Sequence, residues 1–399
     1  MRLIELKIDD FSRVRSLFST SKHLRFTIDA VIAGNSPGRI WVDNPNDPSK
    51  VFLWDGFHCY YLVGTPDNVE FNVALKKLLL DEIIPEAISR NREVFKIEYS
   101  PNEWESFIKE TLKGKLPIKT NRSFFVFNAN SQYPSWRDIL PNDFQVRKID
   151  RELLESNIGN IESIFDEINE CWYSFDDFLQ NGFGFCIIYD QKNGDKSVQG
   201  WCTGEYFSEG KCGIGIMTFR KFQNRGFATA MASEFVDFAV SKGIQPHWDA
   251  WTSNYASIRV ARKVGFEKIE DYHAFMGSFI NSEGFLGTHF YQKEEFETAA
   301  RWFEKAAALG QRQFANYYDA ACSWALTNAI SSAFENLNKA LEHLKEPTLD
   351  IVRHIKNDRD LQCLYTIKEW QKIISHLDEL EKKLTKKKET KKVRNTSNI

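Results

Sequence analysis

The chain has 399 residues, of which 42% are apolar and 14% aromatic, so it is long enough for two or three packed domains. No apolar run approaches the roughly 20 residues that a membrane helix needs, and the first residues contain no basic-then-apolar export signal. The seven cysteines are odd in number, scattered and without a CxxC pair. We therefore expect reduced thiols, no metal site and a cytoplasmic location.

The net charge of −3 is unevenly distributed along the chain. Residues 378–399 hold eight Lys or Arg and four Asp or Glu, which leaves −7 on the rest. An acidic body argues against a nucleic-acid partner. Because residues 379–399 have almost no apolar content, we expect a basic, solubilising tail that is disordered beyond a helical start.

The first region, residues 1–135, alternates between strand-like and helix-like segments. The strand-like segments are 57–64, 94–100 and 124–128, and the helical ones are 71–88 and a segment from Asn102. A connection rich in Asn, Ser and Pro follows at 128–144 and predicts a domain boundary.

The middle region, residues 140–282, has the same mixed character. Helices are expected at 151–165, 174–180 and 257–264 and from Gly226, and strands at 183–189, 198–206, 211–219, 246–252 and near 271–279. The helix between the strands at 211–219 and 246–252 implies that these two strands are parallel.

The helix that begins near Gly226 has an unusual first turn. Its apolar residues recur every three to four positions and form one buried face: Phe227, Ala230, Met231, Phe235 and Phe238. The first backbone N–H groups of a helix have no partner within it and carry a partial positive charge. A glycine there lets an anion approach the backbone, so the turn predicts a phosphate site.

The third region, residues 288–378, is helical and repeats itself. The segments "FETAARWFEKAA" and "ISSAFENLNKAL" align at an offset of 34 residues, the tetratricopeptide period. The alternative interpretation is a plain helical hairpin that packs on the middle domain.

The motif Gln223-x-x-Gly226-x-Ala228 is followed about 30 residues later by "NYASIRVARKVGF", which begins at Asn254. The pair resembles the pyrophosphate loop and the following N-x-x-S/A…K-x-G-F segment of the GNAT superfamily of N-acetyltransferases. Residues 202–254 resemble most the branch that includes the acetyltransferase for self-resistance to zwittermicin. The resemblance implies an α+β fold with a GNAT-like mixed sheet, followed by the all-α tetratricopeptide-like region.

The resemblance also implies acetyl-CoA as co-substrate. By this resemblance the cofactor-binding residues are Ile216, Met217, Thr218, Gln223, Asn224, Arg225, Gly226, Phe227, Ala228, Thr229, Asn254 and Ser257. Residues 1–135 repeat the order of elements as a second, degenerate copy. In that copy the turn "TPDNVEF" lacks glycine, and its acids Asp67 and Glu70 would repel a pyrophosphate.

The expected reaction is acetyl transfer to the primary amine of a small molecule, such as an antibiotic or metabolite. The catalytic candidates are Glu205 and Asp249 as base. By the resemblance, the superfamily's usual acid, a Tyr, falls at Ala261, so Tyr255, a hydroxyl such as that of Ser257, or water would serve as the acid. His247 is a further candidate base on the strand of Asp249. The alternative function is a non-catalytic scaffold whose helical repeats bind a protein partner.

Overall fold

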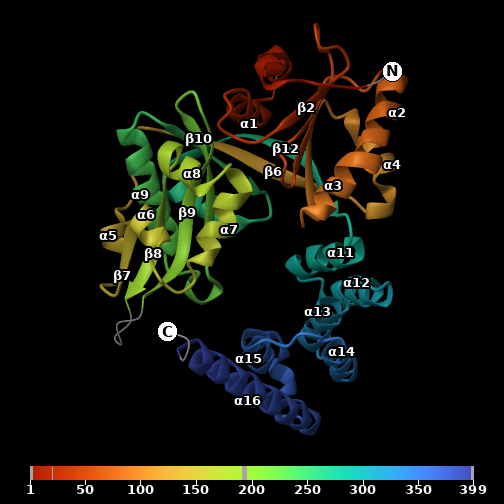
Figure 1. Cartoon of the computed structure of the whole chain (residues 1–399), viewed down its shortest axis with the longest axis vertical. Coiled ribbons are helices and arrows are strands. Elements are labelled where there is room, and N and C mark those ends of the chain that lie inside the picture. The colour runs from red at the N-terminus through yellow and green to blue at the C-terminus, as the bar shows by residue number, and fades with distance from the viewer. Residues whose placement is uncertain (1–2, 20, 191–195, 397–399) are drawn as a thin grey trace. The chain divides into compact units, whose positions relative to one another are not determined.

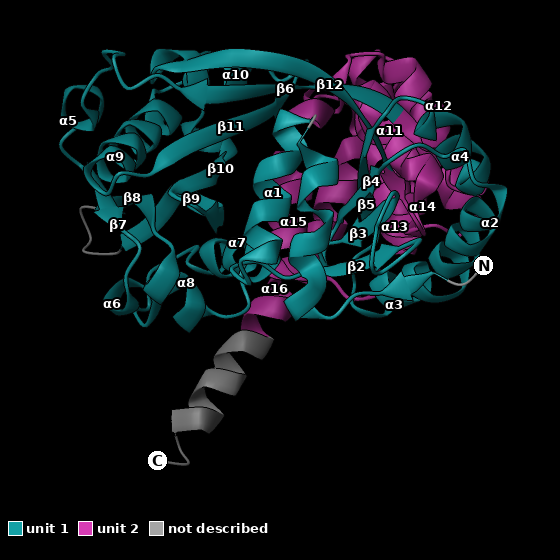
Figure 2. Ribbon diagram, turned by 90° about the horizontal axis from the view of Figure 1, so that it is seen from above, with its two compact units in different colours: residues 1–113, 119–276 teal, residues 114–118, 277–399 magenta. Residues whose placement is uncertain are grey.

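The computed structural model describes residues 3–19, 21–190 and 196–396, with side-chain surroundings as far as residue 386. The chain divides into two compact units, which are described separately. Unit 1 comprises residues 1–113 and 119–276, and unit 2 comprises residues 114–118 and 277–399 (Figure 2). Across the described residues, no helix is both long enough and apolar enough to cross a lipid bilayer.

Residues 3–127 contain six strands and several short helices among the residues that the structure describes. In chain order they are β1 (Ile4–Glu5), η1 (Ile8–Phe18), α1 (Lys22–Ile32), β2 (Arg39–Val42), β3 (Val51–Trp54), β4 (Cys59–Val63), α2 (Val69–Leu78), η2 (Leu79–Ile83), α3 (Ile84–Ser89), β5 (Val94–Ser100), α4 (Trp104–Thr111), η3 (Lys113–Lys115) and β6 (Ile118–Phe127). The expected helix at 71–88 is the continuous run from α2 to α3.

The second half of unit 1 has six further strands. Its elements are α5 (Trp136–Ile139), β7 (Phe144–Lys148), α6 (Arg151–Leu154), α7 (Glu162–Cys171), α8 (Phe175–Asn181), β8 (Gly184–Asp190), β9 (Lys196–Ser208), β10 (Lys211–Thr218), η4 (Arg220–Phe222), α9 (Phe227–Ser241), β11 (Gln245–Trp251), α10 (Tyr255–Lys263) and β12 (Phe266–Ser278). The single helix expected at 151–165 is wrong. Gly159 and Asn160, which has a φ of 64°, interrupt it, so the chain forms α6 and α7 instead.

The twelve strands of the described residues form one mixed sheet in the order β1-β2-β3-β4-β5-β12-β6-β11-β10-β9-β8-β7. Figure 1 shows β6 and β12 in the middle of this sheet, between β10 and β2. The two ends of this order mirror each other. Strands β2, β3 and β4 are antiparallel and β4 runs parallel to β5, just as β8, β9 and β10 are antiparallel and β10 runs parallel to β11. The expected tandem of two copies on a mixed sheet is confirmed.

The last strand of each copy is exchanged between the copies. β6, from the first copy, lies beside β11 of the second, and β12 of the second copy lies beside β5 of the first. Phe125 and Phe127 of β6 share one hydrophobic cluster with Trp248 and Phe266 of the second copy. The expected boundary near residue 135 therefore does not separate independent domains, because both copies build one sheet.

Helix α9 provides the apolar centre of the second copy. Phe227, Ala230, Met231 and Phe235 are buried in one cluster with β8 and β9, as the spacing predicted, and Phe238 packs against that cluster partly buried. Burying a side chain of this size stabilises the fold by about 1.5–3 kcal/mol. This packing fixes the start of α9 against the end of β10.

Unit 2 is helical, as expected. Its elements are α11 (Ser282–Gln292), α12 (Phe296–Ala308), α13 (Gln313–Leu326), α14 (Ile330–Glu342), α15 (Leu349–Asn357), η5 (Arg359–Leu364) and α16 (Lys368–Thr396). Helix α11 contains two glycines, Gly284 and Gly287. Gly287 serves packing there, because a Cβ would lie 2.5 Å from the ring of Phe303 in α12.

The basic tail differs from its expectation of disorder. Helix α16 continues to Thr396, since Lys and Glu are good helix formers and outnumber other residues there. Residues 397–399 of the tail lie outside the described residues. Three aligned apolar pairs of the 34-residue offset are buried in both segments: Ala299 with Ala333, Phe303 with Leu337, and Ala306 with Ala340.

Candidate active site

Strands β10 and β11 begin as neighbours and then separate. Their parallel pairing covers only Lys211 with Gln245 and Cys212 with Pro246 among the described residues. The other edge of β10 stays paired with β9 as far as Thr218. A cavity of about 590 Å³ lies where the two strands diverge, with Ile216, Met217 and Thr218 in its wall. One backbone edge of β10 is thus open to this cavity.

The turn from β10 into α9 forms the second wall. Gly226 is the residue before the helix, with a φ of 82°, and no side chain caps the helix start. Asn224 also has a positive φ of 59°. The Gln223 side chain donates to the Thr218 carbonyl at 3.0 Å and holds the turn against the strand end. The first N–H groups of α9 are therefore left for an outside acceptor.

Gly226 has a structural role that the sequence did not reveal. A Cβ at this position would lie 2.6 Å from Cγ2 of Ile139 in α5. Its left-handed backbone conformation also costs a residue with a side chain roughly 1–2 kcal/mol. The glycine is thus required by the turn and by its neighbour, whatever binds in the cavity.

Helix α10 forms the third wall. The Asn254 side chain caps this helix by accepting from the Ser257 N–H at 3.1 Å, and the Ser257 hydroxyl accepts from the Trp248 indole at 3.0 Å. Arg259 and Lys263 are one turn apart and also line the cavity. Neither makes an ion pair with any residue that the structure describes, so this wall carries unneutralised positive charge.

Eleven of the twelve residues expected to contact the cofactor line this cavity. The exception is Arg225, whose guanidinium lies over the Phe222 ring, 5.7 Å from its centroid. Sequence reasoning missed six lining residues: Phe222, Trp248, Ala256, Arg259, Val260 and Lys263. Arg259 and Lys263 could have been found from sequence, because two basic residues four positions apart lie on one face of the helix that follows Asn254.

A second cavity, of about 310 Å³, shares strands β10 and β11 with the first, through Ile214, Asp249 and Trp251. Both copies contribute to its lining. Its acidic side chains are Glu98, Glu167, Glu170, Glu205 and Asp249, its basic ones are Lys96 and Arg122, and its aromatic ones include Phe26, Tyr61, Tyr206 and Trp251. Both cations are already paired. Lys96 lies 2.8 Å from Glu98, and Arg122 contacts Asp249.

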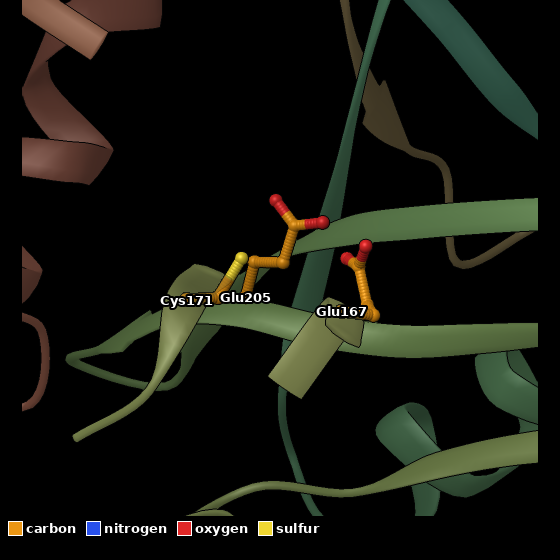
Figure 3. Close-up of side chains that lie close together, drawn as sticks. All are labelled: Glu167, Cys171 and Glu205. Carbon is orange, nitrogen blue, oxygen red and sulfur yellow. The ribbon is translucent and has the colours of Figure 1, made fainter. Parts of the chain in front are cut away.

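Glu167 of α7 and Glu205 of β9 lie together in this cavity (Figure 3). Burial, together with the charge of Glu205, raises the pKa of Glu167 well above its usual value. Burial also raises the pKa of Glu205. Cys171 is buried, and its Sγ and the two carboxylates lie within 4.8 Å of one another.

Two glycines of β10 make room for the groups above them. A Cβ at Gly215 would overlap carboxylate oxygens of both Glu205 and Glu167, and a Cβ at Gly213 would lie 3.1 Å from the Phe26 ring. Residues two apart in a strand share one face, so the ring and the carboxylates are neighbours over β10. The alternating glycines in "KCGIGIMT" were the signal that sequence reasoning missed.

The catalytic candidates have different surroundings. Glu205 lines the second cavity, where its missed partner Glu167 meets it. Asp249 lines it too, but contacts Arg122 and accepts from the Tyr272 hydroxyl. Tyr255 is 72% exposed and lines neither cavity.

His247, the further candidate base, is buried and packs against the rings of Phe26 and Phe124, with centroids 5.5 and 5.3 Å away. Burial lowers the pKa of His247 to about 4. The face of β11 that carries Asp249 and Trp251 is the one that meets the second cavity.

Comparison with known proteins gives relatives of similar length to unit 1. The chain is 23% identical to the uncharacterized N-acetyltransferase YdfB of Bacillus subtilis (strain 168) over 270 residues, 68% of this chain and 97% of that protein. It is similar to the structure of a GCN5-related N-acetyltransferase-like protein from Streptococcus suis, with a TM-score of 0.49, 20% identity and coverage of 67% and 97%. It is also similar to a tandem GNAT protein from the clavulanic acid biosynthesis pathway, with a TM-score of 0.44, 9% identity and coverage of 70% and 98%.

The family match extends across both copies of the fold. The model of the GNAT acetyltransferase family covers residues 15–275, which include strands β2 to β11, most of β12 and every residue that lines the first cavity. This span ends before unit 2 begins its helices. The chain belongs to the GNAT acetyltransferase family.

Proposed function

We propose that this acyltransferase is an acetyl-CoA-dependent N-acetyltransferase that transfers the acetyl group to the primary amine of a small molecule. One observation carries the proposal. The open edge of β10 and the uncapped start of α9 face the same cavity, so strand-like donors and an anion site lie side by side. At about 590 Å³ this cavity has the size of a small-molecule site.

The residues of the cavity suit both ends of the co-substrate. Its pantetheine arm would add to β10 like a strand at Ile216–Thr218, where the Thr218 hydroxyl is buried and has no hydrogen-bond partner among the described residues. The N–H groups of residues 224–229 would hold the pyrophosphate, aided by the charges of Arg259 and Lys263. When bound, acetyl-CoA supplies the acetyl thioester.

The chain's own residues must then deprotonate the amine. An alkylamine of pKa about 10.4 is neutral roughly once in 2,500 molecules at pH 7, a deficit near 4.6 kcal/mol. Glu205 is the base we propose, because it lines the second cavity beside β10 and burial raises its pKa, which makes a carboxylate a better proton acceptor. The β10 backbone N–H groups would stabilise negative charge on the acetyl oxygen.

The sulfur of the co-substrate needs little help to leave, because a thiol has a pKa of about 8.5. The exposed position of Tyr255 therefore does not argue against transfer. We also propose that unit 2 is a tetratricopeptide-like module for a protein partner, on the basis of its 34-residue offset. Membership of the zwittermicin branch is a proposal that rests on residues 202–254.

Calorimetric titration with acetyl-CoA tests the proposal. The double substitution Arg259→Gln and Lys263→Gln should weaken acetyl-CoA binding about 10- to 100-fold, since each change removes one charge-assisted phosphate contact. Arg262→Gln is the matched control, because Arg262 lies between them on α10, is exposed and does not line the cavity. Its dissociation constant should stay within about twofold of wild type. Absence of binding at about 1 mM acetyl-CoA would leave the scaffold alternative.

A further inference from the structure

The second cavity contains one pair of carboxyl groups that the chain itself does not neutralise. Of the acids that line it, Glu98 pairs with Lys96 at 2.8 Å, Asp249 with Arg122, and Glu170 with Arg92 at 3.4 Å. Glu167 and Glu205 have no cationic partner among the residues that the structure describes. Both side chains are half-buried. A partly buried carboxylate without a partner is costly, and an ammonium group from outside would supply that partner.

We propose that the second cavity is the acceptor site, and that it binds a small primary amine without a carboxylate, whose ammonium group rests on Glu167 and Glu205. The inference rests on the proposed function, which supplies the acetyl donor in the neighbouring cavity. It names the class of acceptor and adds Glu167 as a residue that touches it.

The position of the pair fits this role. Glu167 and Glu205 lie directly over Gly215, the residue before Ile216, where the proposed path of the pantetheine arm along β10 begins. An amine held by the two carboxylates would therefore sit next to the strand that carries the thioester. Proximity of this kind is the main requirement for transfer between two bound molecules.

A second group in this cavity, the His23 side chain, has a buried nitrogen without a hydrogen-bond donor among the described residues. His23 lines it and is 8% exposed, and its Nδ1 lies 2.8 Å from the Glu270 carboxylate. With Nδ1 donating to Glu270, Nε2 is an acceptor, and it is buried without a partner among the described residues. An N–H or O–H of the acceptor molecule would satisfy it.

The body of the acceptor would meet apolar and aromatic surface. The Phe26 ring lies over Gly213, next to the carboxylate pair over Gly215, and the Tyr206 ring packs edge-on against it at 5.8 Å. Aromatic faces attract ammonium groups and cover alkyl or aryl chains. A cavity of about 310 Å³ limits the guest to a small molecule.

The absence of a carboxylate follows from the pairing of the cavity's cations. The Lys and Arg side chains among the lining residues, Lys96 and Arg122, already pair with carboxylates of the chain. A substrate carboxylate would have to break one of these pairs or lie unpaired beside Glu167 and Glu205. Either arrangement leaves a buried charge without a partner.

The step balances in atoms and charge. The ammonium group gives one proton to the Glu167–Glu205 pair, and the neutral nitrogen forms a C–N bond with the acetyl carbon. The C–S bond breaks, and the electron pair leaves on sulfur. The second nitrogen proton neutralises the thiolate, and the carboxyl pair returns its proton to water. The products are an N-substituted acetamide, CoA thiol and one proton.

Pairs of amines with and without a carboxylate test the proposed class of acceptor on the wild-type protein. We would compare phenethylamine with phenylalanine and cadaverine with lysine, each pair differing only by a carboxylate, and measure CoA thiol release. We expect kcat/KM to favour the carboxylate-free member at least about tenfold, because the competitor leaves a charge unpaired in the site. Equal or better turnover of the amino acids would overturn the proposal.

Variants test the residues. Glu167→Gln and Glu205→Gln should each lower kcat/KM for the better amine about 100-fold while the dissociation constant of acetyl-CoA stays within about twofold. Asp166→Asn is the control, because Asp166 is the exposed neighbour of Glu167 on α7 and does not line the cavity. If acetyl-CoA binds but both Gln variants acetylate the amine normally, the inference fails together with the role of Glu205 as base, while acetyl-CoA-dependent transfer stands.

Direct titration of the same amine into the protein without acetyl-CoA tests the acceptor site independently of the proposed function. Binding that Glu205→Gln weakens supports the acceptor site even if acetyl-CoA does not bind, in which case only the proposed function fails. Zinc binding in the micromolar range or tighter that both Glu205→Gln and Cys171→Ser abolish would assign the cluster to a metal and overturn the inference.

Discussion

The two copies of the fold in unit 1 differ most at one equivalent place, the gap between the fourth and fifth strands. In the first copy, β4 and β5 are paired over five residue pairs, from Cys59 with Lys96 to Val63 with Ser100. In the second copy, β10 and β11 are paired over two residue pairs and then separate. The same topology thus gives a closed sheet once and an open cleft once.

The helix starts differ in the same way. Asn68 caps α2 by accepting from the Phe71 N–H at 2.9 Å, whereas Gly226 offers α9 no side-chain cap. The acid Asp67 precedes the α2 cap and pairs with Lys50 at 2.9 Å. Strand pairing and capping in the first copy use the backbone donors that the second copy leaves available. The first copy instead contributes side chains to the second cavity, as the lining residues His23, Phe26 and Glu98 show.

The largest effect on acetyl-CoA binding is expected from placing an acidic residue at the start of α9, where the first copy has one at the start of α2. Ala228→Asp places a carboxylate in the first turn of α9, at the wall of the larger cavity. We expect acetyl-CoA to bind at least about 100-fold more weakly, because two anions would compete for one helix start. Thermal unfolding should show unchanged or slightly higher stability, by about 0.3–1 kcal/mol, since an acid at a helix N-terminus is favourable.

Because affinity for acetyl-CoA should fall while thermal stability does not, a loss of binding cannot be ascribed to unfolding. A folded Ala228→Asp protein that binds acetyl-CoA like wild type would show that the start of α9 does not hold the pyrophosphate. The equivalent change in the first copy is already present as Glu70 in the first turn of α2.

The fifth strands of the two copies predict a pH effect. His247 of β11 and Lys96 of β5 are each the third residue of their strand. Lys96 is ion-paired, whereas both nitrogens of His247 lack partners among the described residues. Burial lowers the pKa of His247 to about 4, below its unfolded value of 6.5. The unfolded state therefore binds the proton first, and stability is lost as the pH falls from about 6.5 to 4, by up to about 3 kcal/mol.

His247→Phe should remove this loss, because a phenyl ring keeps the stacking on Phe26 and Phe124 and has no proton to bind. Urea unfolding of both proteins at pH 5 and pH 8 measures the difference. The variant should be more stable than wild type at pH 5 by about 1–2 kcal/mol and close to it at pH 8. An equal pH dependence in both proteins would mean that His247 titrates normally.

Local features of the second copy could be predicted from sequence, because they depend on neighbours along the chain. The apolar spacing of α9 and the glycine turn at Gly226 are signals of that kind. The exchange of β6 and β12 could not be predicted, since strand pairing between distant segments leaves no local pattern. Glu167 was missed for the same reason. It sits on a helix whose start was misplaced and meets Glu205 only through tertiary packing.

The smallest effect is expected from removing the cap of the first copy. Asn68→Ala should lower the stability of unit 1 by about 1 kcal/mol, because the Phe71 N–H loses its acceptor at the start of α2. Thermal or urea unfolding measures this. Acetyl-CoA affinity should stay unchanged, since β4 and β5 remain paired over five residue pairs and leave no room for a strand-like arm. Loss of the cap frees the Phe71 N–H but does not open an edge of β4. The two copies can therefore be compared by acetyl-CoA binding as well as by stability. If the Asn68→Ala protein bound a second equivalent of acetyl-CoA, capping rather than strand closure would be what keeps the first copy from binding it.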